Sequence, residues 1–202
     1  ETTAAATVNP PLAPRFGTAG KPLPGTSVRI AEDGEILLRG GQVFAAYWNN
    51  GDATAEAFRD GWFRTGDTGE LDDDGYLAVT GRQKDLLVTA SGKNVAPGPL
   101  EDVIRSHPLV SQCLVIGDDR PFVAALVTLD DGASPDDPAV VEEIGTAVAE
   151  ANATVSRAES IREFRVVEGD FTEENGLLTP SLKVRRGAAL EAYADVVADI
   201  YG

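Results

Sequence analysis

The sequence is poor in several residue types that often carry protein chemistry. Its 202 residues include no methionine, one cysteine and one histidine. A single cysteine excludes an intrachain disulfide framework and a cysteine metal site, and Cys113 lies in an apolar run where a buried hydrophobe is expected. A single histidine, His107, excludes a histidine metal pair. Disulfide bonds within the chain and metal sites built from cysteine or from a histidine pair are therefore not expected.

Positive charge and long apolar runs are also scarce. The net charge is -16, which disfavours nucleic acid or an anionic membrane surface as the main partner, and no basic patch is visible in the sequence. No stretch approaches the roughly 20 apolar residues of a transmembrane segment, and no amino-terminal leader is recognisable. We expect a cytoplasmic protein. Because the chain lacks methionine and opens on Glu1-Thr2-Thr3, we also expect a piece of a longer protein.

Lysine is used sparingly and in particular places. Thirteen arginines supply most of the positive charge, whereas three of the four lysines, Lys84, Lys93 and Lys183, lie in two short polar segments. A flexible primary ammonium differs from a planar guanidinium in reach and hydration, so this choice suggests that lysine is needed at those points.

Strand and helix patterns alternate along the chain, which predicts an α+β fold. Residues 1–25 are punctuated by proline and glycine and indicate a loop, or disorder once detached. Strands are expected at 26–30, 34–40, 61–67, 75–80, 85–89, 110–116, 122–129 and 161–167, with hairpins at 26–40 and 110–129. Helices are expected at 52–58, 97–106, 136–149 and 187–200. Leu190, Tyr193, Val197 and Ile200 share one stripe of the last helix. No internal repeat stands out.

Asp67 and Arg82 are the first candidates for ligand contacts. Asp67 stands between glycines in Thr65-Gly66-Asp67-Thr68-Gly69, where the backbone can approach a ligand and the carboxylate can accept hydrogen bonds from a diol such as a ribose. A plain turn at a strand end explains the same pattern. Arg82 lies in Gly81-Arg82-Gln83-Lys84-Asp85, which is equally compatible with a solvated, salt-bridged surface turn.

Two glycine- or proline-bearing loops carry the other lysines. Gly92 is the centre of a small polar segment that continues into Lys93 and Asn94, and a simple turn is the alternative interpretation. Lys183 ends the run Leu178-Thr179-Pro180-Ser181-Leu182-Lys183. An extended ammonium on a mobile loop suits a step in which charge builds on a carboxylate and a phosphate, although an ordinary surface lysine would look the same.

Taken together and in order, the segments around Asp67, Arg82, Gly92 and Lys183 resemble the carboxyl-terminal portion of the adenylate-forming superfamily, which contains acyl-CoA synthetases, peptide-synthetase adenylation domains and luciferases. The run that ends in Lys183 is most similar to that of long-chain fatty acyl-CoA ligases. Many other branches carry glycine before this lysine, whereas this chain has Leu182.

The resemblance implies a role for each segment. Asp67 would hold the ribose hydroxyls of ATP and of the acyl-adenylate, and Arg82 the ribose or phosphate. Lys84 would be a hinge and Lys183 the catalytic lysine of adenylation. Gly92, with Lys93 and Asn94, would line the channel for the pantetheine arm of CoA. Glu1 resembles the glutamate that helps to place Mg²⁺ at the phosphates.

The implied fold is a small β-barrel-like remnant of a large AMP-binding domain over residues 1–81, a hinge at 82–85, and a mobile α+β lid over 86–202. The implied activity of the parent is ATP-dependent fatty acid–CoA ligation through an acyl-adenylate, with fatty acid, ATP and CoA as substrates and the missing amino-terminal domain as partner. Peripheral membrane contact of the parent stays compatible with the sequence. The chain lacks the family's phosphate-binding loop, so it is expected to be inactive alone. The alternatives are another adenylate-forming enzyme, such as an aryl-CoA ligase or a peptide-synthetase adenylation domain, and a noncatalytic binding module.

Overall fold

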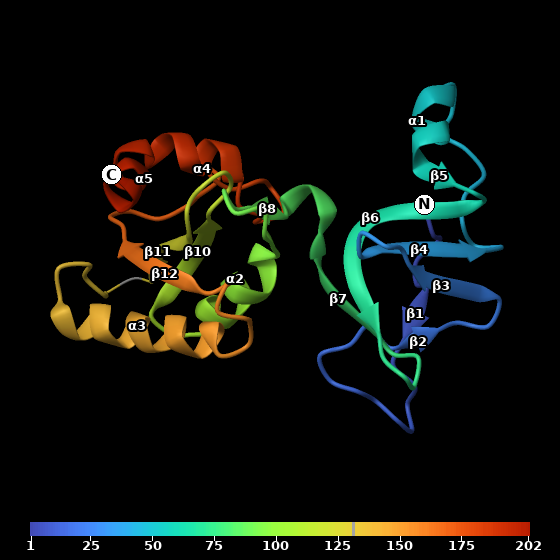
Figure 1. Ribbon diagram of the computed structural model, residues 1–202, viewed down its shortest axis with the longest axis horizontal. Helices are drawn as coiled ribbons and strands as arrows, with labels where there is room; N and C mark the ends of the chain where they lie inside the picture. Colours follow the sequence, from blue (N-terminus) through green and yellow to red (C-terminus); the bar gives the residue numbers. More distant parts are fainter. Residues whose placement is uncertain (131) are drawn as a thin grey trace. The chain divides into compact units, whose positions relative to one another are not determined.

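The computed structural model describes residues 1–130 and 132–202, and the chain divides between Asp85 and Leu86 into two compact units. We call Glu1–Asp85 the amino-terminal unit and Leu86–Gly202 the carboxyl-terminal unit. Figure 1 shows that strands dominate the first, whereas helices cover a small sheet in the second. Among the described residues, no helix combines the length and apolarity that crossing a bilayer requires.

A five-stranded antiparallel sheet forms the amino-terminal unit. Its strands are β3 (Thr26–Ile30), β4 (Glu35–Gly40), β5 (Phe58–Arg59), β6 (Trp62–Leu71) and β7 (Leu77–Arg82). The order is β3-β4-β6-β5, and β7 also pairs with β6. The predicted hairpin at 26–40 is confirmed, with Ile30 opposite Ile36 across the turn. The long strand β6 changes neighbours along its length, pairing with β5 near Phe63 and with β7 from Asp67 to Leu71.

The α+β class is confirmed, but the expectation of a barrel-like remnant is wrong. Within the described residues the sheet stays open, because β3 and β5 at the two ends of its path do not pair with each other. Its core is small, with Ile36, Leu38, Phe63 and Leu77 buried under partly exposed neighbours. The short helix α1 (Gly51–Ala57) begins at Asn50, whose side chain accepts a hydrogen bond from the Ala53 amide.

Residues 1–25 are more ordered than the sequence indicated. Two short strands, β1 (Thr7–Val8) and β2 (Lys21–Pro22), pair in this segment, and Ala19 and Gly20 exchange backbone hydrogen bonds with Leu77. The segment is thereby attached to the sheet through its backbone rather than through a hydrophobic pattern that a sequence would reveal.

The carboxyl-terminal unit is built around a three-stranded sheet of order β10-β11-β12. The short 3₁₀ turn η1 (Gln83–Asp85) ends the amino-terminal unit. The elements of the carboxyl-terminal unit are β8 (Leu87–Val88), β9 (Asn94–Val95), α2 (Pro97–Arg105), β10 (Val110–Ile116), β11 (Val123–Leu129), α3 (Pro138–Asn152), β12 (Ile161–Val166), α4 (Arg186–Ala192) and α5 (Ala194–Tyr201). The hairpin of β10 and β11 is antiparallel, as predicted. β12 runs parallel to β11, which the connection through α3 makes possible.

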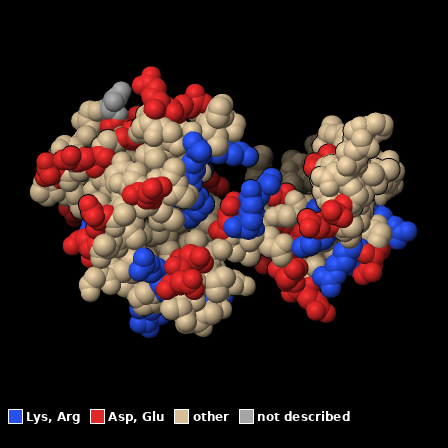
Figure 2. Space-filling view, turned by 90° about the horizontal axis from the view of Figure 1, so that it is seen from above, with Lys and Arg blue, Asp and Glu red and all other residues tan. Residues whose placement is uncertain are grey.

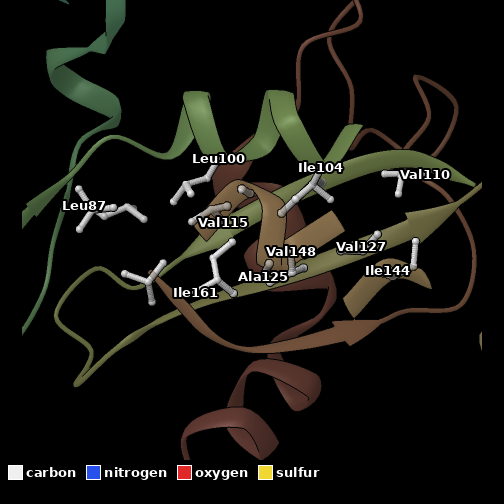
Figure 3. Packing of buried hydrophobic residues seen from close by; sticks show 14 residues of the cluster. Leu87, Leu100, Ile104, Val110, Val115, Ala125, Val127, Ile144, Val148 and Ile161 are labelled. Carbon is white, nitrogen blue, oxygen red and sulfur yellow. The ribbon is translucent and has the colours of Figure 1, made fainter. Parts of the chain in front are cut away.

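Both faces of this sheet are buried, so its strands are continuous apolar runs. On one face Val115, Ala125 and Val127 pack with Leu100 of α2 and Ile144 of α3, as Figure 3 shows. On the other face Leu114, Leu126 and their neighbours pack against Val197 and Ile200 of α5. Cys113 is buried in the first cluster, and burial raises the pKa of its thiol far above the usual range, as expected for an inert hydrophobe.

The last predicted helix is two helices. The backbone of Tyr193 leaves helical geometry between α4 and α5, and its hydroxyl donates a hydrogen bond to the Glu168 carbonyl. The predicted stripe therefore holds only in part: Val197 and Ile200 are buried, whereas Leu190 is 39% exposed. Figure 2 shows basic side chains interspersed with acidic ones over the face in view.

Candidate functional site

A cross-strand ion pair joins the two predicted nucleotide contacts. Asp67 of β6 lies opposite Arg82 of β7 in the register of the sheet, and Arg82 Nε is 2.9 Å from Asp67 Oδ1. The Asp67 side chain is 33% exposed and that of Arg82 52% exposed. This contact uses one oxygen of the carboxylate, so the second oxygen can accept hydrogen bonds from a ligand. The Asp67 carboxylate is therefore already positioned to accept hydrogen bonds, with the Arg82 guanidinium beside it.

The backbone before Asp67 is held by a buried carboxylate that the sequence interpretation missed. Glu35 is only 3% exposed; its Oε1 accepts a hydrogen bond from the Gly66 amide at 3.0 Å, and its Oε2 accepts one from Arg64 Nε at 2.9 Å. Gly66 has φ +70°, a left-handed conformation that glycine adopts without steric cost. Glu35 therefore fixes the turn from which Asp67 projects.

Thr65 supplies a second restraint on the same turn. Its hydroxyl donates to the Ile36 carbonyl at 2.7 Å and accepts from the Asp67 amide at 3.1 Å. The residues that make these hydrogen bonds all belong to strands β4 and β6. The position of Asp67 therefore depends on the sheet and not on a free loop.

Glu1, Asp67 and Arg82 line one hollow of about 650 Å³ in the amino-terminal unit, together with Glu35 and Tyr47. Tyr47 donates a hydrogen bond from its hydroxyl to Glu1 Oε1 at 2.8 Å, and this bond, helped by desolvation, raises the pKa of the tyrosine. Three of the predicted site residues are thus brought together. The volume is in the range of small-molecule pockets.

Lys84 lies outside this hollow. It is exposed in the short 3₁₀ turn η1, next to the boundary between the two units. Its neighbour Gln83 donates a hydrogen bond to Asp33 Oδ2 at 2.9 Å, which ties the start of the turn to the β3–β4 hairpin. Nothing comparable restrains Lys84 itself among the described residues.

The Gly92 segment is a tight turn that closes the β8–β9 hairpin. Thr89 donates its amide to the Lys93 carbonyl at 3.0 Å and accepts the Gly92 amide at 2.7 Å. The Thr89 hydroxyl accepts the Lys93 amide at 3.2 Å and lies 3.0 Å from the Ser91 hydroxyl. Asn94, which follows, pairs with Val88 and is exposed. The turn therefore presents its lysine to solvent.

Lys183 is presented by a second turn with the same hydrogen bonds. Thr179 donates to the Lys183 carbonyl at 2.9 Å and accepts the Leu182 amide at 2.8 Å. Its hydroxyl accepts the Lys183 amide at 3.1 Å and lies 3.0 Å from the Ser181 hydroxyl. Each distance agrees with its counterpart in the first turn to within 0.1 Å.

The repeated signal is Thr-x-Ser-x-Lys, present as Thr89-Ala90-Ser91-Gly92-Lys93 and as Thr179-Pro180-Ser181-Leu182-Lys183. This five-residue repeat corrects the expectation that the chain has no internal repeat. The flanking pairs match as well, because Val88 faces Asn94 and Leu178 faces Val184.

The fourth position distinguishes the two turns. Gly92 has φ +80° and open space on the side where a side chain would project, whereas Leu182 adopts φ +58° and is 66% exposed. A left-handed conformation costs a residue with a side chain roughly 1–2 kcal/mol. Leucine thus occupies a place that glycine fills without this cost.

The two lysines also differ in their partners. Lys93 Nζ lies 3.3 Å from Glu159 Oε1, whereas Lys183 has no carboxylate within 4.0 Å among the described residues. Arg186, three residues after Lys183, donates to Glu101 Oε1 of α2 at 2.6 Å and to the Val115 carbonyl. The end of the Lys183 loop is therefore anchored in the unit, while its ammonium is available to an anion.

A model of the family described as "AMP-binding enzyme C-terminal domain" matches residues 84–202. Long-chain-fatty-acid–CoA ligase FadD15 of Mycobacterium tuberculosis is 52% identical over 205 residues, covering 93% of this chain and 34% of the relative. Putative fatty-acid–CoA ligase fadD11 of the same species is 36% identical over the whole chain and 38% of its own length. Human long-chain-fatty-acid–CoA ligase ACSBG1 is 32% identical, covering 93% of this chain and 32% of the relative.

Solved structures show the same arrangement of elements. The ATP-bound RpMatB-BxBclM chimera B1 superimposes with a TM-score of 0.72 at 29% identity, over 96% of this chain and 40% of that one. The anthranilate CoA ligase AuaEII in complex with anthranoyl-AMP gives 0.72 at 26% identity, over 95% and 37%. The chain spans about a third of the length of the curated relatives it matches. On the family match over residues 84–202, the chain belongs to the AMP-binding enzyme family and contains its C-terminal domain.

Proposed function

We propose that this chain is the carboxyl-terminal part of an ATP-dependent long-chain fatty acid–CoA ligase. The single observation that carries the proposal is the exposed Lys183 turn in a chain that is 52% identical to a relative named as such a ligase. In the proposed reaction a fatty carboxylate attacks the α-phosphorus of ATP, giving acyl-adenylate and diphosphate. The thiolate of CoA then attacks the acyl carbonyl, and AMP leaves as the thioester forms.

The hollow around Asp67 suits the nucleotide in the first half-reaction. The carboxylate of Asp67 can accept hydrogen bonds from both hydroxyls of a ribose, and Arg82, held 2.9 Å from it, adds a cation near the phosphate. Glu35 fixes the Gly66 turn, so little ordering is needed when the ligand binds.

Lys183 is the proposed catalytic residue of adenylation. Negative charge is shared between the attacking carboxylate and the α-phosphate, and an ammonium that contacts both stabilises the transition state more than the separate reactants. The Thr179–Lys183 turn leaves this ammonium without a carboxylate partner among the described residues, so no ion pair is lost when it engages substrate.

The Gly92 turn is proposed to serve the second half-reaction. Apart from Gly92 and its two chain neighbours, no atom of the described residues lies within 4 Å of the position that a Cβ would take there, so the narrow pantetheine arm could pass on that side, with Lys93 and Asn94 beside it. Lys93 is held by Glu159 at 3.3 Å, so a phosphate of CoA would have to compete with that carboxylate. This difference from Lys183 fits a lysine that lines a channel rather than one that contacts the reacting atoms.

Use of both turns at one reaction centre requires the two units to change pose. We propose that residues 1–81 end the large AMP-binding domain, that residues 82–85 with Lys84 are the hinge, and that residues 86–202 are the mobile lid. A hinge absorbs a large backbone rotation in few residues, and the exposed Lys84 has the freedom that this needs. The missing amino-terminal domain would supply the acyl pocket and the phosphate-binding loop.

Glu1 stays a predicted Mg²⁺ ligand. Magnesium in nucleotide sites takes one or two carboxylates together with phosphate oxygens and water. The described residues gather no group of three or more potential metal ligands, and the Glu1 carboxylate accepts the Tyr47 hydroxyl. Glu1 would therefore have to hold the ion together with phosphate oxygens of the nucleotide. Cytoplasmic location likewise stays a prediction.

Another member of the same superfamily is the second candidate. The anthranilate CoA ligase AuaEII and the o-succinylbenzoate CoA synthetase of Bacillus subtilis share the fold at 26–28% identity. The higher identity to relatives named fatty-acid–CoA ligases favours an aliphatic substrate over an aryl one.

The decisive experiment uses the full-length enzyme and a series of fatty acids of increasing length. We expect ATP–diphosphate exchange that depends on a fatty acid, and its loss by at least about a hundredfold in Lys183→Ala, the size expected for one transition-state electrostatic contact. Thioester formation from supplied acyl-adenylate should persist. Lys21→Ala is the matched control, because this remaining lysine lies over the Tyr76 ring, away from the hollow. Normal exchange by Lys183→Ala would overturn the assignment of the lysine, and activation of aryl but not fatty acids would favour the second candidate.

A further inference from the structure

The turns that carry Lys93 and Lys183 can be compared directly because their local structures are nearly the same. Four corresponding hydrogen-bond distances agree to within 0.1 Å, and both turns have the Thr-x-Ser-x-Lys pattern. Their backbone geometry therefore does not explain why the fourth residue is glycine in one turn and leucine in the other. Both residues have positive φ, at +80° for Gly92 and +58° for Leu182. Glycine meets the conformational demand of this turn with no side chain to strain.

Two features of Leu182 are energetically unfavourable in this structure. Its backbone is in a region that disfavours a side chain, and that side chain is apolar and 66% exposed to water. Pro180, with its fixed φ, stiffens the turn that Ala90 leaves free in the other copy. The Lys183 turn is therefore stiffer than its counterpart, and it displays a leucine at its tip.

We infer that Leu182 is a specificity-determining residue that contacts the apolar chain of the acyl substrate next to the carboxylate engaged by Lys183. The inference rests on the proposed function. A fatty acid is a carboxylate bonded directly to an apolar chain, and Lys183 with Leu182 presents a cation and an apolar side chain on adjacent residues. Strain retained at a site of action commonly serves function, and contact with an alkyl chain would bury the exposed leucine.

Three substitutions separate the properties of this side chain. Leu182→Gly removes both the side chain and the strain. Leu182→Asn keeps a side chain of similar size and tolerates positive φ, but replaces the apolar group by an amide. Leu182→Met keeps an apolar side chain and is the conservative control.

The measurement is carboxylate-dependent ATP–diphosphate exchange by the full-length enzyme with hexadecanoate and with acetate, which has no methylene group next to its carboxylate for Leu182 to contact. We expect Leu182→Gly and Leu182→Asn to raise KM for hexadecanoate about tenfold, with KM for ATP unchanged and the effect on acetate threefold or less. Leu182→Met should retain wild-type preference. The effect is thus a change of selectivity between two acids, which a merely structural role of the turn would not produce.

Two results would overturn the inference while leaving the proposed function intact. An equal loss with both acids would assign Leu182 to the geometry of the turn or to contact with another part of the protein. Unchanged kinetics in all three variants would leave the leucine without a role in substrate binding. Failure of the wild-type enzyme to activate any fatty acid would instead refute the proposed function, and the two failures are therefore distinguishable.

Discussion

The two units of this chain are stabilised in different ways. Among the described residues of the carboxyl-terminal unit, a hydrophobic cluster of fourteen buried residues packs on one face of the sheet and one of eleven on the other, and nearly all of them are aliphatic. Among its described residues the amino-terminal unit has a core cluster of four buried residues, and its sheet also carries the ion pairs of Glu35 with Arg64 and of Asp67 with Arg82. Burial of apolar surface is the larger source of stability. The carboxyl-terminal unit therefore has a large hydrophobic core of its own, whereas the amino-terminal unit carries a polar site on a sheet with a small core.

The positions of the aromatic side chains make this comparison measurable. Both tryptophans, Trp48 and Trp62, lie in the amino-terminal unit, so tryptophan fluorescence reports that unit alone. The longer helices α2 and α3 lie in the other unit, whose unfolding dominates the loss of helical circular dichroism. We expect the fluorescence transition at a lower urea concentration than the dichroism transition.

The largest expected effect is in the carboxyl-terminal core. Leu126 is fully buried between the sheet and the last helices, so Leu126→Ala should lower the free energy of unfolding of that unit by about 3 kcal/mol. The dichroism transition in urea should move to lower concentration and the fluorescence transition should stay. An equal displacement of both transitions would show that the units unfold as one and would break the comparison.

The next effect concerns the buried carboxylate of the amino-terminal unit. Glu35→Gln keeps the shape but removes the charge that Arg64 and the Gly66 amide contact, so the unit should lose about 1–2 kcal/mol, a charge-assisted bond discounted for the partial exposure of Arg64. Here the fluorescence transition should move. Glu70→Gln, at an exposed position of the neighbouring strand β6, is the matched control. No difference between the two variants would mean that Glu35 is not an anchor.

A smaller effect is expected from the two turns. Gly92→Leu forces a side chain into a left-handed conformation and should destabilise the carboxyl-terminal unit by about 1 kcal/mol. Leu182→Gly should stabilise it by about half of this, since the relief of strain is partly offset by the greater freedom of glycine in the unfolded chain. Urea unfolding followed by dichroism measures both, and a stabilising Gly92→Leu would contradict the strain attributed to Leu182.

The smallest effect is electrostatic. The Ser156 side chain, with smaller contributions from its amide and from Lys93, lowers the pKa of Glu159 below its usual 4.5. A carboxyl whose folded pKa is lowered stabilises the fold above its unfolded pKa, and this contribution is lost as pH falls through the folded pKa. Because the Glu159 side chain is still 27% exposed and its partner Lys93 44% exposed, solvent screens the interaction and we expect less than about 0.5 kcal/mol. The stability difference between wild type and Glu159→Gln should therefore vanish from pH 6 to pH 3; a constant difference would exclude ionisation as its cause.

Local patterns predicted most of the elements, because their signals lie within a few residues. The Val110–Leu129 hairpin has two apolar runs around a glycine- and proline-bearing turn, and α2 follows prolines at its first turn. Contacts between distant residues account for what was missed. Glu35 is buried because Arg64 and Gly66 lie beside it in the sheet, 29 and 31 residues later. At the break between α4 and α5, Tyr193 donates a hydrogen bond to the carbonyl of Glu168, 25 residues earlier, a partner that the local pattern does not reveal.

Part of the candidate site was predicted from the sequence, and part became visible only in the structure. Glu1, Asp67 and Arg82 were chosen through family resemblance, and the structure gathers them around one hollow without testing their roles. The two lysine turns have the same sequence pattern, Thr-x-Ser-x-Lys. A pattern of five residues with two variable positions is too short to indicate a structural repeat, and only the matching hydrogen bonds reveal it.

The central claim is that the two matched turns serve different half-reactions, and a crossed comparison in the full-length enzyme tests it most directly. ATP–diphosphate exchange and thioester formation from supplied acyl-adenylate would be measured for Lys183→Ala and for Gly92→Leu. We predict that Lys183→Ala loses the exchange and keeps thioester formation, and that Gly92→Leu does the reverse because its side chain would enter the proposed CoA channel. Loss of the same half-reaction in both variants would contradict the account.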